Sequence, residues 1–76
     1  MFKVGDRVVV LKNNLTDKKY IGTKAYIINP KDDDCVMRQF LVSLTGIPVI
    51  ALKMVEDGKI QYISKRNACD IIYKIQ

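Results

Sequence analysis

The residues of this 76-residue chain that could do chemistry are basic and aromatic side chains gathered around the polar stretch from Asn13 to Gly22. Lysine ammonium groups can neutralise phosphates, and a tyrosine ring can stack on a base. Two more cations precede the last predicted strand and are expected at the same end of the molecule. We therefore predict a nucleic-acid-binding surface made of Lys12, Lys18, Lys19, Tyr20, Lys24, Lys65 and Arg66. The alternative is a solvated lysine loop with Tyr20 folded back onto the protein.

The net charge is consistent with either role for these cations. Thirteen Lys and Arg residues against eight Asp and Glu residues give a formal charge of +5 and an isoelectric point near 9.4. Such an excess attracts polyanions or acidic protein surfaces at long range, and it also keeps small domains soluble. The positive charge therefore favours an acidic partner but does not tell whether that partner is a nucleic acid or a protein.

Catalytic groups are poorly represented in the sequence. The chain has no histidine, the side chain that most often acts as general acid or base, and no serine or cysteine lies in a nucleophile motif. Cys69 is next to Asp70, and a negatively charged neighbour does not favour a reactive thiolate. We expect a non-catalytic protein with no cofactor and no small-molecule substrate.

Metal sites are also not expected. Cys35 and Cys69 cannot complete a four-ligand zinc shell without histidine, and both thiols are expected to be small buried hydrophobic side chains. The run from Asp32 to Asp34 supplies carboxylates for a hard cation, but successive side chains in a turn point in different directions. We expect this run to be a solvated turn.

The location of the protein is inferred from what the N-terminus and the apolar runs lack. No basic segment followed by a long apolar stretch opens the chain, and no apolar run approaches the roughly 20 residues of a membrane span. We expect a cytoplasmic, reduced protein with no membrane partner.

The composition favours strands over helices. Ten Ile and eight Val stand against three Ala and five Leu, and β-branched side chains suit a pleated, half-buried surface. Turn residues divide the chain, and Asp57-Gly58 between two β-rich runs is the strongest hairpin signal. The expected strands are Asp6 to Lys12, Thr23 to Asn29, Cys35 to Leu44, Val49 to Val55, Ile60 to Ser64 and Ile71 to Ile75.

The segment from Cys35 to Leu44 is ambiguous, because its apolar positions fit a strand or a short helix. A strand is favoured because the segment ends in Phe-Leu-Val-Ser-Leu and runs directly into the turn from Thr45 to Pro48. The alternative is a helix on which a β-meander packs.

These elements predict an all-β fold in one domain covering residues 1–76. Five or six short strands with turns about ten residues apart are typical of a small antiparallel barrel or sandwich. The barrel is favoured because its closure removes exposed sheet edges. The stretch from Lys65 to Asp70 is expected to form one short helical turn near the C-terminus.

The first 29 residues resemble the opening of SH3-like barrels of the KOW type, which occur in NusG-type transcription factors and several ribosomal proteins. The resemblance lies in Gly5-Asp6, the alternating valines Val8 and Val10, a polar loop, and a second strand that starts at Gly22. Ala25 stands where the family has a second glycine. The resemblance implies an SH3-like β-barrel and a role in transcription or translation.

Two kinds of partner remain open. The first is RNA or DNA, bound without sequence specificity by the basic loop. The second is a protein, for example a larger host complex on which a small phage-encoded regulator docks, since the Ile-, Lys- and Asn-rich usage suits an AT-rich genome such as that of a phage. Apolar side chains in excess of a small core would then form an interface, and the candidates are Val9, Leu11, Tyr26, Ile28 and Tyr62. An exposed sheet edge could also bind a peptide.

Overall fold

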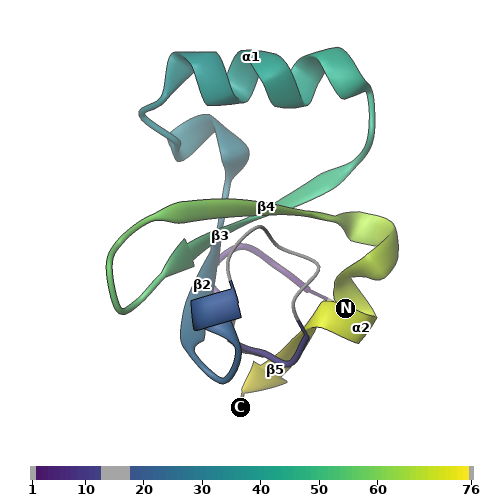
Figure 1. Ribbon diagram of the computed structural model, residues 1–76. Coiled ribbons are helices and arrows are strands. Elements are labelled where there is room, and N and C mark those ends of the chain that lie inside the picture. Colours follow the sequence, from purple (N-terminus) through teal and green to yellow (C-terminus); the bar gives the residue numbers. More distant parts are fainter. Residues whose placement is uncertain (1, 13–17, 76) are drawn as a thin grey trace.

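A computed structural model describes residues 2–12 and 18–75 of the chain. Its centre is an antiparallel sheet of five strands in the order β4-β3-β2-β1-β5, as the all-β expectation requires. Figure 1 shows the strands, which are β1 (Arg7–Val10), β2 (Lys24–Ile28), β3 (Val49–Met54), β4 (Ile60–Ser64) and β5 (Ile72–Ile75). The last strand returns to pair with the first, so that Val10 faces Ile72.

Within the described residues, two helices and three 3-10 turns connect the strands. The turns are η1 (Lys18–Tyr20), η2 (Pro30–Asp32) and η3 (Lys65–Asn67), and the helices are α1 (Val36–Thr45) and α2 (Ala68–Ile71). The short helical turn expected near the C-terminus is confirmed by η3 and α2. Residues 13–17 of the predicted first loop lie outside the described residues.

The strand predicted from Cys35 to Leu44 is wrong, because this segment forms α1. Its ends explain the difference. The Sγ atom of Cys35 accepts a hydrogen bond from the Arg38 amide at 3.4 Å and caps the first turn. Gly46 ends the helix with φ at +66°, a left-handed conformation that glycine adopts at no steric cost. The helical alternative is therefore correct for this segment.

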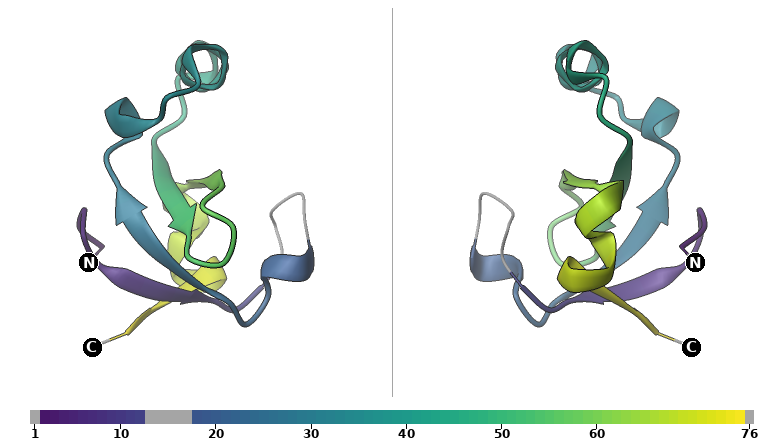
Figure 2. Two further views of the ribbon diagram at one scale, coloured as in Figure 1. Left: turned by 90° about the vertical axis from the view of Figure 1, so that its left-hand side faces the viewer. Right: turned by 90° about the vertical axis from the view of Figure 1, so that its right-hand side faces the viewer.

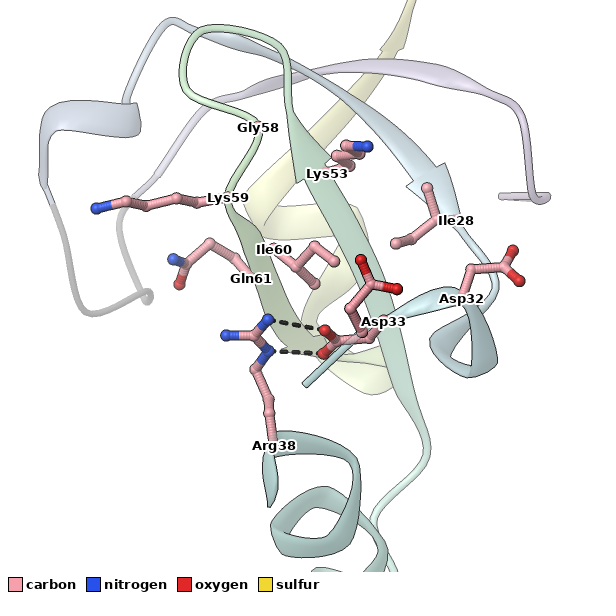
Figure 3. Close-up of a pocket in the computed structure, with 10 residues that line it drawn as sticks. Ile28, Asp32, Asp33, Arg38, Lys53, Gly58, Lys59, Ile60 and Gln61 are labelled. Carbon is pink, nitrogen blue, oxygen red and sulfur yellow. Dashed lines mark hydrogen bonds and ion pairs between the residues drawn. The ribbon is translucent and has the colours of Figure 1, made fainter. Parts of the chain in front are cut away.

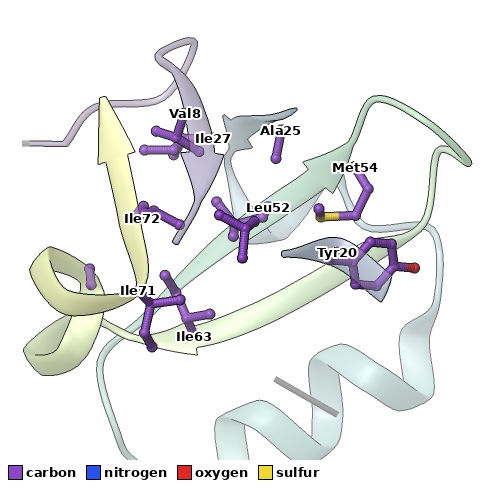
Figure 4. Packing of buried hydrophobic residues seen from close by; sticks show 11 residues of the cluster. Val8, Tyr20, Ala25, Ile27, Leu52, Met54, Ile63, Ile71 and Ile72 are labelled. Carbon is purple, nitrogen blue, oxygen red and sulfur yellow. The ribbon is translucent and has the colours of Figure 1, made fainter. Parts of the chain in front are cut away.

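The core lies on one face of the sheet and under the C-terminal turn. Val8 and Val10 point into it as the alternation of β1 predicts, and Ala25 and Ile27 do the same from β2. Figure 4 shows how these side chains meet Leu52, Met54, Ile63, Ile71, Ile72 and Tyr20. Each strand thus contributes side chains to one apolar cluster, and α1 contributes none.

Two predicted turn features are present. Gly5 has φ at +95°, and the Asp6 carboxylate accepts a hydrogen bond from the Lys3 amide at 2.8 Å. Gly58 has φ at +71° in the hairpin between β3 and β4. These positions fix where β1 begins and where β3 reverses.

The helix α1 is the outermost element of the molecule. Figure 2 shows it end-on, standing apart from the sheet and joined to it by η2 on one side and the segment before β3 on the other. No residue of α1 is buried. Among residues 2–12 and 18–75, no helix has the length and apolar character needed to cross a membrane.

Candidate interaction surfaces

Tyr20 does not offer the stacking surface predicted for it. Its side chain is 2% exposed, and its hydroxyl donates a hydrogen bond to Asp57 Oδ2 at 2.8 Å. The ring therefore belongs to the core and ties η1 to the β3–β4 hairpin. This corrects the expectation that Tyr20 stacks on a base and agrees with the alternative in which it folds onto the protein.

The predicted basic residues near the loop lie around this buried tyrosine. Lys19 forms an ion pair with Asp57 at 3.4 Å, and its Nζ lies 5.1 Å from the centre of the Tyr20 ring. Lys12 is exposed directly after β1, and Lys24 is exposed at the start of β2. Lys18 is the first residue of η1. Lys19 is thus partly neutralised, whereas Lys12 and Lys24 present their charge to solvent.

Lys65 and Arg66 lie near the opposite end of β3 from Lys24. Ser64, which precedes them, faces Val49 at the start of β3. Lys24 instead accepts a hydrogen bond from the amide of Val55, just past the end of β3. At about 3.3 Å per residue, the length of β3 separates the two groups by roughly 20 Å along the strand. Lys24 therefore does not lie beside Lys65 and Arg66, whereas the Lys12 amide donates a hydrogen bond to the Ile71 carbonyl, just past the turn that carries them.

A different basic and aromatic surface lies on the sheet face opposite the core. Tyr26 of β2 pairs with Arg7 of β1 on one side and with Lys53 of β3 on the other. Directly opposed residues have Cβ atoms about 5 Å apart, so the ring lies between two cations. Lys24 shares this face two residues before Tyr26, and Tyr73 lies on it from β5. We call Arg7, Lys24, Tyr26, Lys53 and Tyr73 the outer sheet face.

The outer sheet face is accessible and positively charged. The Tyr26 side chain is 43% exposed, and Tyr73 is more exposed still. Arg7, Lys24 and Lys53 make no ion pair with another described residue, and Lys53 borders a cleft that it shares with Asp32. An aromatic ring flanked by unpaired cations can stack on a base while the cations meet the phosphates on either side.

A second feature is the buried carboxylate of Asp33, which holds α1 to the sheet (Figure 3). Arg38 donates two hydrogen bonds to it, from Nε at 2.6 Å and from Nη2 at 2.7 Å. The Tyr62 hydroxyl donates a third at 2.7 Å, and the Cys35 amide a fourth at 3.0 Å. Asp33 is only 3% exposed, so the prediction of a solvated turn is wrong at this residue. We call Asp33, Arg38 and Tyr62 the α1 anchor.

The anchor controls the ionisation of its members. The Arg38 guanidinium holds the pKa of Asp33 far below its usual range, and Asp33 in turn raises the pKa of Arg38. Burial, together with the hydrogen bond to Asp33, raises the pKa of Tyr62 to about 12. A carboxylate this firmly ionised and this fully hydrogen-bonded neither accepts nor releases a proton near neutral pH. The cluster is therefore a structural contact.

A cleft of about 450 Å³ adjoins the anchor and is drawn in Figure 3. Asp32, Asp33, Arg38 and Lys53 line it, together with the hairpin residues Gly58 to Gln61. Its lining carries both signs of charge and includes no Ser, Thr, Cys or His side chain. The two cysteines also differ from the expectation of buried hydrophobic side chains, because Cys69 is exposed and Cys35 is partly exposed at the start of α1.

The third feature is the apolar side of α1. Five large side chains recur at the spacing of one helical face and are each between 55% and 78% exposed. We call Val36, Met37, Phe40, Leu41 and Leu44 the α1 apolar face. Of the surplus apolar residues predicted from sequence, Leu11 and Tyr26 are exposed, while Val9, Ile28 and Tyr62 are partly buried.

No protein-family model, curated protein or solved structure matches this chain. The surfaces above therefore rest on the geometry of this molecule alone.

The outer sheet face was not found from the sequence, although part of the signal was there. Lys24 and Tyr26 are two residues apart in a predicted strand, so their side chains point to the same face. What places Arg7 and Lys53 on either side of Tyr26 is the register of three strands, which depends on long-range pairing.

Proposed function

We propose that this protein is a cytoplasmic, non-catalytic module that binds nucleic acid without sequence specificity, through the outer sheet face. The observation that carries the proposal is the cross-strand row in which Tyr26 stands between Arg7 and Lys53. Lys24 extends the positive charge along β2, and Tyr73 offers a second exposed ring.

The chemistry of this face favours a single strand of RNA or DNA. Unstacked bases can lie on tyrosine rings whatever their identity, because every base has a π-face. Arg7, Lys24 and Lys53 would each meet a phosphate, and a contact of this kind carries no sequence information. The face has no hydrogen-bonding side chain of the Asn or Gln type for the edge of a base, which fits binding without sequence specificity.

The resemblance of the first 29 residues supports the same proposal. An SH3-like barrel of the KOW type implies a role beside the transcription or translation machinery. The pairing of β5 with β1 and the short helical turn before β5 are consistent with a curled sheet of that class. Gly5, Asp6 and Val8 then serve the construction of the sheet, and the binding residues alternate with them in the strands.

The test is a titration of labelled single-stranded oligonucleotides with the protein at low and moderate salt. Three phosphate contacts predict a loss of affinity of about 20-fold between 50 and 200 mM salt. Tyr26→Thr, which keeps a β-branched residue in the strand, should weaken binding by about 5- to 100-fold through lost stacking. Lys53→Glu should weaken binding and reduce the salt dependence.

The matched control is Lys65→Glu, which reverses the same charge at an exposed lysine at the other end of β3. It should retain most of the wild-type affinity, apart from the small effect of a lower net charge. Equal losses for Lys53→Glu and Lys65→Glu would show that attraction is diffuse and that the outer sheet face is not the site. Absence of binding at 50 mM salt would refute nucleic-acid binding altogether.

A further inference from the structure

The structure points to an interaction surface separate from the outer sheet face: we infer that two copies of this chain associate by antiparallel packing of their α1 apolar faces. The five side chains of the α1 apolar face occupy an arc of roughly 140° when residues are placed at 100° intervals around a helix. Nothing in the described part of the chain covers them, since α1 has no buried residue.

The position of the α1 apolar face is fixed by the polar contacts on the other side of the helix. Arg38 is held by Asp33, and the Gln39 side chain donates to the Lys31 and Asp33 carbonyls. These contacts turn the polar side of α1 toward η2 and leave its apolar side facing outward. The exposure is therefore built into the fold.

The area of this face suits a protein interface. Together with Ile47, which follows the helix and is also exposed, the five side chains expose on the order of 600 Å². Two copies would bury roughly 1,200 Å² in total, the lower limit for a specific interface. Ile47 also lines an open groove of about 360 Å³ between the end of α1 and β4, where the edge of a second helix could insert.

The pattern of side chains favours a second copy over other occupants. Met37 and Leu44 are placed symmetrically about a point between Phe40 and Leu41. A two-fold axis at that point sets Met37 of each copy against Leu44 of the other and brings the two Phe40-Leu41 pairs together. An interface between identical subunits needs such self-complementarity.

The charges on α1 argue in the same direction. Arg38 is the one charged side chain of the helix, and Asp33 already neutralises it. A basic or acidic partner would find no complementary charge on this face. A membrane surface is also disfavoured, because helices that lie on membranes carry several Lys or Arg residues on their polar side. An uncharged apolar face matches another uncharged apolar face.

The experiment is sedimentation velocity on the full chain over a concentration series from about 1 to 200 µM, which brackets the micromolar affinity expected of a small interface. The wild type should pass from the 8.7 kDa monomer to a species of twice that mass. Leu41→Glu and Leu41→Lys should each remain monomeric. Val55→Glu is the control, because Val55 is as exposed as Leu41 but lies at the β3–β4 hairpin; it should dimerise like the wild type.

Mixing the two charged variants tests the geometry. Because Leu41 lies beside the proposed axis, an equimolar mixture of Leu41→Glu and Leu41→Lys should recover dimers that neither forms alone. Circular dichroism of each variant verifies that the fold is kept, as expected for side chains outside the core cluster. A wild type that stays monomeric at 200 µM, dimers that persist in both Leu41 variants, or a mixture without recovery would each overturn the proposal. In the first case, α1 would serve a different partner.

Discussion

The sheet and α1 are similarly rich in apolar residues, but they use them in opposite ways. The strands bury Val8, Leu52 and Met54 almost completely, so that one face of the sheet is packed and dry. The helix has a comparable density of large apolar side chains and buries none of them. What holds α1 in place is a polar contact, the α1 anchor, in which a buried carboxylate is fully hydrogen-bonded. The number of apolar side chains therefore does not determine whether a segment is buried in its own chain. The contacts that position the segment decide whether those side chains face the core or the solvent.

The largest expected effect is a difference in stability between substitutions at two leucines, one buried in the core and one exposed on α1. Leu52→Ala removes a fully buried side chain from the core and should lower the free energy of unfolding by about 3 kcal/mol. Leu41→Ala, on the α1 apolar face, should change it by less than about 0.5 kcal/mol at low micromolar protein concentration, where a weak dimer dissociates. Urea denaturation followed by circular dichroism measures both. Similar losses for the two variants would mean that α1 packs on the core in solution.

The next largest effect on stability concerns the α1 anchor. Asp33→Ala leaves the Arg38 guanidinium, the Tyr62 hydroxyl and the Cys35 amide without their acceptor, and should cost about 2 to 3 kcal/mol. We expect the loss to fall mainly on α1, so amide hydrogen exchange should rise in residues 36–45 and stay slow in β1 and β3.

Asp32→Ala is the control for this prediction, since Asp32 is the exposed neighbour in the same turn. Its substitution should leave the exchange of α1 nearly unchanged. If Asp32→Ala loosened the helix as much as Asp33→Ala did, the total negative charge of the turn rather than the α1 anchor would hold α1.

The smallest effect is a pH dependence that arises at the α1 anchor. The folded state raises the pKa of Tyr62 from 10.0 to about 12, so its stabilising effect is present below pH 10 and is lost as the pH rises toward 12. The lowered pKa of Asp33 acts in the other direction: its contribution is present above about pH 4 and is lost as the pH falls through the folded-state value.

Tyr62→Phe isolates the alkaline part of this dependence. The variant should lose about 1 to 2 kcal/mol less stability than the wild type between pH 10 and 12, because it has no hydroxyl to ionise. Denaturation curves at several pH values in this range provide the measurement. Parallel pH profiles for the two proteins would assign the alkaline loss to other groups.

Local sequence patterns predicted the sheet better than they predicted its surfaces. The alternation in β1 placed Val8 and Val10 in the core, and Asp57-Gly58 marked the hairpin, because both signals act over a few residues. The same logic failed for α1, where the helical spacing from Val36 to Leu44 was outweighed by the Phe-Leu-Val-Ser-Leu ending and the turn that follows it. The evidence for a helix was present in the residues that follow the segment. Glycine and proline commonly end helices, and they occur here as Gly46 and Pro48.

Burial of polar and aromatic groups was harder to foresee. Tyr20 in a lysine-rich loop and Asp33 in a run of aspartates both have sequence neighbours typical of a surface. Each has a hydrogen-bond partner that is distant in the sequence, Asp57 for Tyr20 and Tyr62 for Asp33. Contacts between residues about 30 or more positions apart depend on the tertiary fold, so local sequence patterns do not predict them.

The order of the strands has a consequence for how this protein could be altered. β2 and β3 are antiparallel neighbours in which Ile28 faces Ala51, so a short hairpin could join them directly. The chain instead runs out through η2 and α1 before it returns. The helix is therefore an insertion between two strands that pair without it. Its exposed side chains can change to suit a new partner, or the whole segment can be exchanged for another, while the sheet keeps its core and its outer sheet face.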